Sequence, residues 1–203
     1  DETRKAHLVG QVFVKDDWYA AYKYGLGTSR FHNDIILPTT GIAYGLARNV
    51  IVGETAKNEA FTYVDYPKKV LTILPTLGGT EGSARAINAQ GTVVGHSTNE
   101  LGLRHATQWT GGVPKDLGVL ADGGQHSTAA AISDAGVAVG CADKGAELLR
   151  TAVKFEADAV VELGTLNAGN GEVQLVGKAT EAVVRMGVAH VPDGRGTFTA
   201  LSV

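Results

Sequence analysis

The sequence predicts an all-β protein, a β-propeller of about five four-stranded blades, from three observations. A glycine that ends a β-branched run recurs at a nearly constant spacing. Each interval holds short β-rich segments, which turn residues separate about every 8 to 12 residues. Glycine is abundant, with 27 residues, and Val and Thr recur in short runs, which favours strands over helices.

The recurring glycine follows an apolar residue in five places. These glycines are Gly10, Gly53, Gly95, Gly140 and Gly177, separated by 43, 42, 45 and 37 residues. Glycine inside a strand marks a bulge, a bend or a close backbone approach. Because the inner strands of a propeller crowd around a central axis, we expect these glycines to let the copies approach one another there.

Two further motifs follow each glycine, which is itself the first motif of the repeat. The second is a small residue with an aromatic three positions later: Ala21 and Tyr24, Ala60 and Tyr63, Ala106 and Trp109, Ala152 and Phe155, with Val188 and Val191 in the last copy. The third begins at a leucine: Leu37, Leu74, Leu117, Leu163 and Leu201. We expect the aromatics to fill the space between neighbouring blades. The order of the motifs predicts one repeat-built domain over residues 1–203, with repeats 1–40, 41–79, 80–124, 125–168 and 169–203.

The clearest copy predicts four strands, at 83–87, 92–97, 103–109 and 115–120. The turn between the first two, "NAQG", has Asn at its start and Gly at its end. Four strands in about 42 residues is the size of one propeller blade. A β-sandwich would not need a four-strand unit that repeats in register, so a propeller is the better prediction.

The two ends of the chain predict incomplete copies. The first and last repeats lack room for a full first strand, so the chain starts near a second strand and stops on a fourth. N-terminal residues that complete the last blade would close the ring, which we favour; the alternative is an arc of a longer array. The chain starts at Asp1 without Met, so we expect a processed or trimmed N-terminus.

Composition excludes several classes of partner. A net charge of −3 gives no electrostatic basis for binding nucleic acid or an anionic membrane. No apolar stretch approaches the ~18 residues of a membrane-spanning helix. Apolar residues make up 44% and charged residues 19%, as in globular proteins, and the single cysteine, Cys141, rules out an internal disulfide.

The segments "PTLGGTEGSARAINAQGTVVGHS", "GLRHATQW" and "DLGVL" resemble the HAF repeat of bacterial extracellular proteins. The similarity is close over residues 70–166 and looser outside them. His105, Ala106 and Trp109 stand on the repeat's HAF-x-W motif, with Thr107 in place of the phenylalanine. An earlier copy keeps Ala-Phe, after Glu59 rather than His. The resemblance implies a bacterial, secreted or surface-exposed, propeller-like protein, and it supplies no catalytic residues.

The position after each repeat glycine carries five different polar residues. They are Gln11, Glu54, His96, Cys141 and Lys178. Core positions do not usually vary in this way, so one interpretation is that these side chains line a central cavity and bind a ligand. The other interpretation places them on the solvent side of a sheet edge.

A second candidate surface lies near the N-terminus. Its residues are Trp18, Tyr19, Tyr22, Arg30 and Phe31. Aromatic and arginine side chains are enriched at interface hot spots, and exposed aromatics also stack on sugars. Alternatively, Tyr24 is the aromatic of the blade and its neighbours cover an open sheet edge.

Catalytic and metal motifs are weak. The sequence has no G-x-S-x-G nucleophile motif. Cys141 would need a base such as His96 to act as a nucleophile, and a buried cysteine is the simpler interpretation. His96, His105 and His126 lack ligand spacing, and Asp16, Asp17 and Asp34 suit solvated loops better than a calcium site. The aspartate of "SDAGVAVG", Asp134, suits a turn. We expect no metal and no cofactor.

These patterns predict a non-enzymatic, exported scaffold that engages a protein, a glycan or a surface through its loops or a central funnel. It could form part of a larger exported protein. The alternative is a carbohydrate-active hydrolase with its site on the central face. Such an enzyme usually needs two carboxylates roughly 5 to 10 Å apart. Glu54 is the only acid among the five polar positions.

Overall fold

The structure, a computed structural model, describes residues 5–14, 17–26, 31–64, 69–145, 149–156 and 159–163. These residues belong to one compact unit, 1–164, and a second unit, 165–203, lies outside them. The expected fifth repeat therefore lies outside the described residues, with Gly177 and Lys178. The described elements are all strands, which confirms the prediction of an all-β fold, and they form three antiparallel sheets. Within the described ranges, no helix is long and apolar enough to span a membrane.

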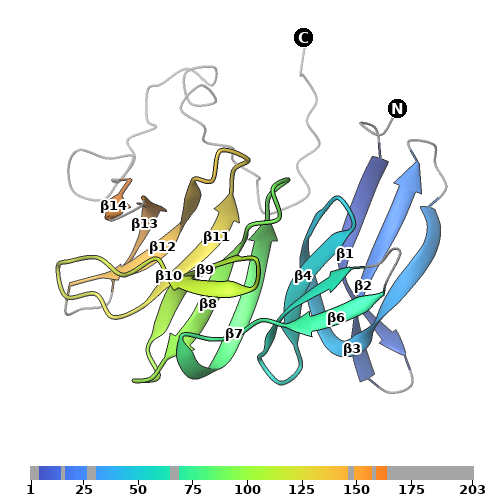
Figure 1. The fold of residues 1–203 in the computed structure, drawn as a ribbon, viewed down its shortest axis with the longest axis horizontal. Helices are drawn as coiled ribbons and strands as arrows, with labels where there is room; N and C mark the ends of the chain where they lie inside the picture. The colour runs from blue at the N-terminus through green and yellow to red at the C-terminus, as the bar shows by residue number, and fades with distance from the viewer. Residues whose placement is uncertain are drawn as a thin grey trace, which may run out of the picture. The chain divides into compact units, whose positions relative to one another are not determined.

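The first sheet has six antiparallel strands in sequence order (Figure 1). They are β1 (Lys5–Val14), β2 (Asp17–Leu26), β3 (Phe31–Ala47), β4 (Val50–Thr55), β5 (Ala60–Val64) and β6 (Val70–Ile73). β3 is 17 residues long and pairs with β2 as far as Thr40 and with β4 from Gly41 onward. The expected boundary between residues 40 and 41 therefore falls inside one continuous strand, which joins the first two copies into one sheet.

Two four-stranded antiparallel sheets follow, each in sequence order. One contains β7 (Gly78–Ile87), β8 (Val93–Asn99), β9 (Arg104–Thr110) and β10 (Val113–Asp116). The other contains β11 (Ser127–Ile132), β12 (Ala138–Lys144), β13 (Leu149–Phe155) and β14 (Val160–Glu162). The fourth strand expected at 115–120 is shorter and earlier, because pairing with β9 ends at Asp116.

Backbone hydrogen bonds show that the second and third motifs are equivalent in three successive copies. The N–H of the motif leucine donates to the carbonyl of the motif alanine, from Leu74 to Ala60 at 2.8 Å, from Leu117 to Ala106 at 2.9 Å and from Leu163 to Ala152 at 2.9 Å. The same local pairing therefore recurs where the sequence motifs recur.

The register corrects the motif in the first copy. Gly95 pairs with Thr107, the residue after the motif alanine, and Gly53 and Gly140 pair in the same way. In the first copy, however, Gly10 pairs with Ala21 itself. The structural equivalent of the motif alanine is therefore Ala20, which is fully buried, and not Ala21.

The repeat glycine is needed inside its own sheet and not between copies. A Cβ would lie 2.1 Å from the Ile42 carbonyl oxygen at Gly53, 1.9 Å from that of Ser83 at Gly95 and 2.0 Å from that of Thr128 at Gly140. Each carbonyl lies next to a β-bulge on the strand that precedes the glycine's own strand and pairs with it: Ile42 on β3, Ser83 on β7 and Thr128 on β11. A Cβ on Gly10 would meet nothing within 4 Å, since β1 pairs only with β2.

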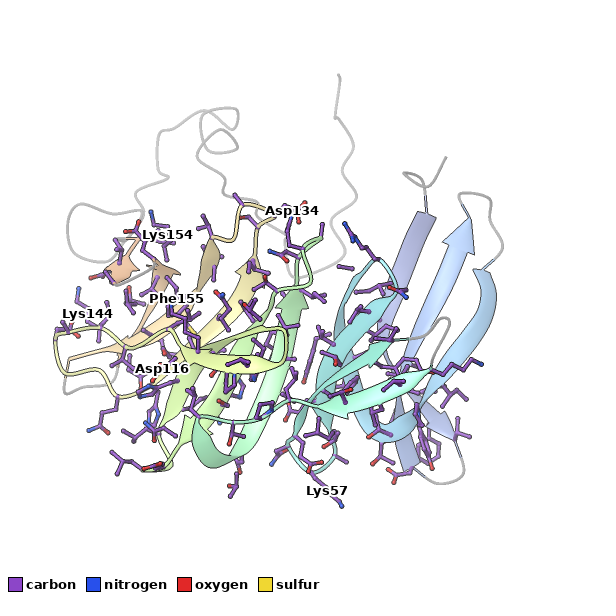
Figure 2. The ribbon with its side chains drawn as sticks, in the orientation of Figure 1. Lys57, Asp116, Asp134, Lys144, Lys154 and Phe155 are labelled. Atoms are coloured by element: carbon purple, nitrogen blue, oxygen red, sulfur yellow. The ribbon has the colours of Figure 1, made fainter. Side chains whose placement is uncertain are left out.

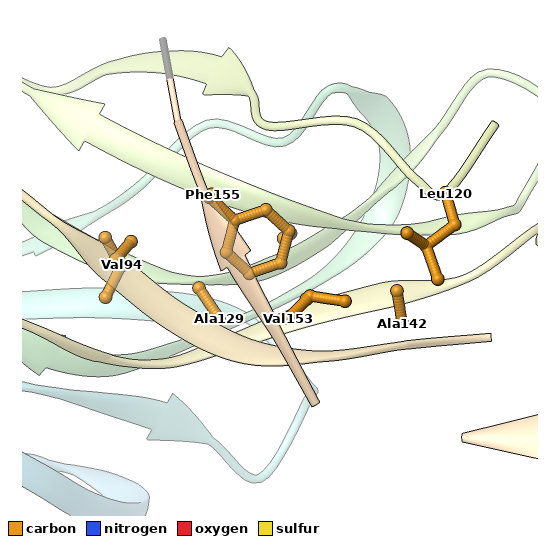
Figure 3. Packing of buried hydrophobic residues seen from close by; sticks show 8 residues of the cluster. Val94, Leu120, Ala129, Ala142, Val153 and Phe155 are labelled. Carbon is orange, nitrogen blue, oxygen red and sulfur yellow. The ribbon is translucent and has the colours of Figure 1, made fainter. Parts of the chain in front are cut away.

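The core consists of three clusters, each between successive copies. One joins β2 and the N-terminal part of β3 to the rest of the first sheet, the next joins that sheet to β7–β9, and the third joins β8 and β9 to β11–β13 (Figure 3). Each cluster contains one buried motif aromatic, in order Tyr63, Trp109 and Phe155. These aromatics fill space against the preceding copy. Trp109 also donates its indole N–H to the Pro75 carbonyl at 2.7 Å.

Candidate functional site

The polar positions after the glycines recur on corresponding strands. Glu54, His96 and Cys141 lie on β4, β8 and β12, and each is half-buried. His96 lies two residues after Val94, which packs against β11–β13, so both side chains are on the face toward the next sheet. Gln11, at the corresponding position on β1, is exposed.

Glu54 reaches the following sheet through an arginine. The Arg85 Nη2 on β7 lies 3.6 Å from Oε2 of Glu54, and the Tyr44 hydroxyl donates to the same oxygen at 3.4 Å. The Arg85 guanidinium also lies 4.1 Å from the centroid of the Tyr44 ring, a cation–π contact. Burial raises the pKa of the Tyr44 hydroxyl, with Arg85 acting in the opposite direction and Glu54 adding to the rise.

His96 lies among three arginines. Its pKa is lowered from 6.5 to about 4, first by burial and then by the positive charges of Arg104, Arg85 and Arg150, in that order. The imidazole is therefore neutral at pH 7. Its Nδ1 is buried and makes no hydrogen bond within the described residues.

Cys141 contacts an arginine. The Nη1 of Arg150 donates to Cys141 Sγ at 3.4 Å, and the Nε of Arg150 lies 3.6 Å from Oδ1 of the buried Asp143. A guanidinium does not accept a proton at ordinary pH, so Arg150 cannot serve as a general base for the thiol. No hydrogen bond joins Cys141 to His96 among the residues described.

Two of these arginines line a cavity of about 240 Å³, which we call the arginine pocket. Its lining residues are Glu81, Thr98, Gly102, Arg104, His126 and Arg150, from both four-stranded sheets. The backbone N–H of Arg104 donates to Nδ1 of His126 at 3.1 Å. A neutral His126 therefore carries its proton on Nε2, where it is available as a donor.

Sequence reasoning did not identify Arg85, Arg104 and Arg150 as site residues. A signal was present for two of them, because Arg-x-Ala precedes the motif aromatic both at 104–106 and at 150–152. Arg85 has no counterpart in the next copy, where Ala130 stands at the corresponding place between the paired Ala129 and Ala131. Its role depends on contact with another sheet, which one strand's sequence does not reveal.

The N-terminal surface is described only in part. Trp18 is 50% exposed and Tyr19 is partly buried. Tyr22 and Phe31 lie in β2 and β3, but their side chains, and the whole of Arg30, are outside the described residues. The structure adds Phe13, which pairs directly with Trp18 across β1 and β2 and is 55% exposed. The two ring centroids are 5.3 Å apart.

The other polar candidates lie apart from one another. His105 Nδ1 is 2.7 Å from Asp116 Oδ2, and Asp17 accepts a hydrogen bond from the backbone N–H of Trp18. Asp134, labelled in Figure 2, accepts a hydrogen bond from the backbone N–H of Ala89 at 2.9 Å, so it links the turns of two successive copies. Among the described residues, no three His, Cys, Asp or Glu side chains are placed to share a metal ion. Asp16 and the side chain of Asp34 lie outside the described residues.

Comparisons with protein families, with curated proteins and with solved structures found no match.

Proposed function

We propose that this chain is a non-enzymatic binding scaffold of the β-propeller type, secreted or displayed on a bacterial surface, that engages a protein or glycan. Its single domain spans the five repeats and resembles the HAF repeat. The observation that carries the proposal is a repeated framework with one variable polar position. Glu54, His96 and Cys141 occupy the same place in successive copies, beside a constant glycine.

The packing of the first strands supports the propeller arrangement. β7 lies against β3, β4 and β5 of the preceding sheet, and β11 lies against β7, β8 and β9. The clusters between copies are built largely from the first three strands of each unit. First strands that meet at an axis, with fourth strands outermost, are the arrangement of propeller blades.

The contacts of Glu54 and Cys141 favour binding over hydrolysis. Glu54 is engaged by Arg85 and Tyr44, and Cys141 by Arg150. A glycoside hydrolase would need a second acid opposite Glu54, and the corresponding positions carry His96 and Cys141. Because other side chains hold Glu54 and Cys141 in place, these two residues form a fixed polar surface, which suits binding better than hydrolysis.

A glycan-array and pull-down screen with the 203-residue chain tests the proposal. We expect at least one glycan or protein to be retained without chemical change, and Arg85→Gln to weaken its retention. Lys57→Gln, at the exposed β4–β5 turn (Figure 2), is the control for loss of one positive charge. Release of reducing sugar by the wild-type chain, abolished in Glu54→Gln, would contradict the proposal and favour the hydrolase.

A further inference from the structure

We propose that the arginine pocket binds a small hydroxylated carboxylate, of the kind that uronate residues supply in acidic polysaccharides. This inference rests on the proposed binding function, and it names the ligand class that one part of the scaffold recognises.

Arg104 provides the anion site. Arg104 lines the pocket, and its guanidinium makes no hydrogen bond or ion pair with any other residue that the structure describes. The side chain is on the exposed β9 position next to the turn, so a ligand reaches it from solvent. An arginine fork matches a carboxylate with two parallel hydrogen bonds, which makes a carboxylate a better partner than a neutral group.

Arg150 and His126 extend this donor set. Arg150 uses Nε and Nη1 on Asp143 and Cys141, which leaves N–H groups of its fork for a ligand. The Nε2 proton of His126 is a further donor on the pocket wall. Arg104 and Arg150 come from different sheets and line the same pocket, so we expect a bound carboxylate to contact both of them.

The remaining wall selects for hydroxyl groups. Glu81 offers carboxylate oxygens, and no hydrogen bond or ion pair occupies its side chain among the described residues. Every lining residue is polar, charged or glycine, so no purely hydrocarbon side chain lines the pocket. A volume of about 240 Å³ is also below the ~300 to 1,000 Å³ of sites for drug-sized ligands. A monosaccharide that carries a carboxylate on one side and hydroxyl groups on the other matches both the polar lining and the small volume of the pocket.

Three buried polar atoms on β7 and β8, outside the pocket lining, also lack a hydrogen-bond partner among the described residues. They are Ser83 Oγ, Arg85 Nε and His96 Nδ1. Ser83 and His96 pair directly across β7 and β8, and the charges of Arg104 and Arg150 act on His96. Buried polar atoms are rarely left unpaired.

Calorimetric titration of the 203-residue chain with glucuronate, glucose and glutamate tests the inference. We expect saturable binding of glucuronate, with glucose and glutamate at least about tenfold weaker, since each lacks one half of the recognised chemistry. Arg104→Gln should weaken glucuronate binding at least about tenfold, because it removes the charged fork. Arg104→Lys should fall between the two, because it keeps the charge without the fork. Lys57→Gln should bind as the wild type does.

Four results would overturn the inference: no saturable binding of glucuronate, equal binding of glucose, equal binding of glutamate, or full affinity in Arg104→Gln. Circular dichroism of Arg104→Gln establishes that the variant is folded, and its exposed side chain has no partner to lose among the described residues. The scaffold proposal is tested separately. A partner from the screen that Arg104→Gln still binds would leave the scaffold in place and remove only this ligand assignment.

Discussion

Gly95 on β8 and Ser83 on β7 lie so close that a Cβ on Gly95 would be 1.9 Å from the Ser83 carbonyl oxygen. The contact occurs beside a β-bulge in the first strand, and it recurs at Gly53 and Gly140. The repeat glycine is therefore a consequence of how the first two strands of each unit fit together.

Gly95→Ala should lower the free energy of unfolding by about 3 kcal/mol or more, because strand backbone must move to admit the methyl group. Gly10→Ala is the matched control, since it changes the same repeat position where nothing lies within 4 Å. We expect it to alter the free energy of unfolding by less than about 0.5 kcal/mol. Urea unfolding of both variants measures the difference, and equal effects would contradict this explanation of the glycine.

The two tryptophans should differ sharply. Trp109 is 1% exposed and donates to Pro75, whereas Trp18 is half exposed. Trp109→Ala should cost about 3 to 5 kcal/mol, and Trp18→Ala less than about 1 kcal/mol. Thermal and urea unfolding measure both. The emission of a Trp18→Phe variant comes from Trp109 alone and should be blue-shifted, and water-like emission from that variant would place Trp109 at the surface.

His96 should make the fold sensitive to acid. Its pKa is about 4 in the folded chain and 6.5 as an ordinary value, so the unfolded chain binds the proton first as the pH falls. Stability that is complete above pH 6.5 is then lost between pH 6.5 and about pH 4, up to about 3 kcal/mol in all. His96→Gln should flatten this part of the profile, which urea unfolding at a series of pH values measures.

The arginines provide a control for this assignment. Arg104→Gln removes a positive charge near the imidazole, so the pKa of His96 should rise, whereas Lys57→Gln should leave it in place. An NMR titration of the imidazole carbon-bound protons reports both. A pKa of His96 near 6.5 in the folded wild type would contradict the buried environment described here.

The aromatic residues of the N-terminal surface, Trp18 and Phe31, should contribute to partner binding and not to folding. Trp18→Ala and Phe31→Ala are expected to abolish binding of a partner from the pull-down while leaving circular dichroism unchanged. Phe13→Ala should act in the same direction, because Phe13 supports the Trp18 ring. Loss of folding in Trp18→Ala would instead favour a role in covering the sheet edge.

Much of the fold could be predicted from the sequence because its signals are local. Turn residues and alternation placed the second and third strands of the third copy to within about two residues, whereas its first strand begins five residues earlier than predicted and its fourth is shorter. The recurring leucine and alanine form the same hydrogen bond in three copies. The continuous β3 was missed, since nothing in the sequence around Gly41 distinguishes a strand that changes partner from a turn. The offset at Ala20 was missed because two adjacent alanines fit the motif equally well.

The sequence predicted the polar strand residues of the site but not the arginines that contact them. Variation at one strand position pointed to Glu54, His96 and Cys141, but their charged partners come from other strands and sheets. Arg85 reaches Glu54 across a gap between sheets, and Arg150 reaches Cys141 from the neighbouring strand. Such pairings depend on how sheets stack, which strand periodicity does not encode.

Distances between spin labels at equivalent turns test the propeller arrangement most directly. Cysteines replace Lys57, Glu100 and Lys144, one exposed residue near the same turn in each of three copies, in a Cys141→Ser background. If five blades surround one axis, the two neighbouring distances are equal and the 57-to-144 distance is about 1.6 times either of them. A 57-to-144 distance equal to the sum of the other two would show sheets stacked in a line, and it would contradict the propeller.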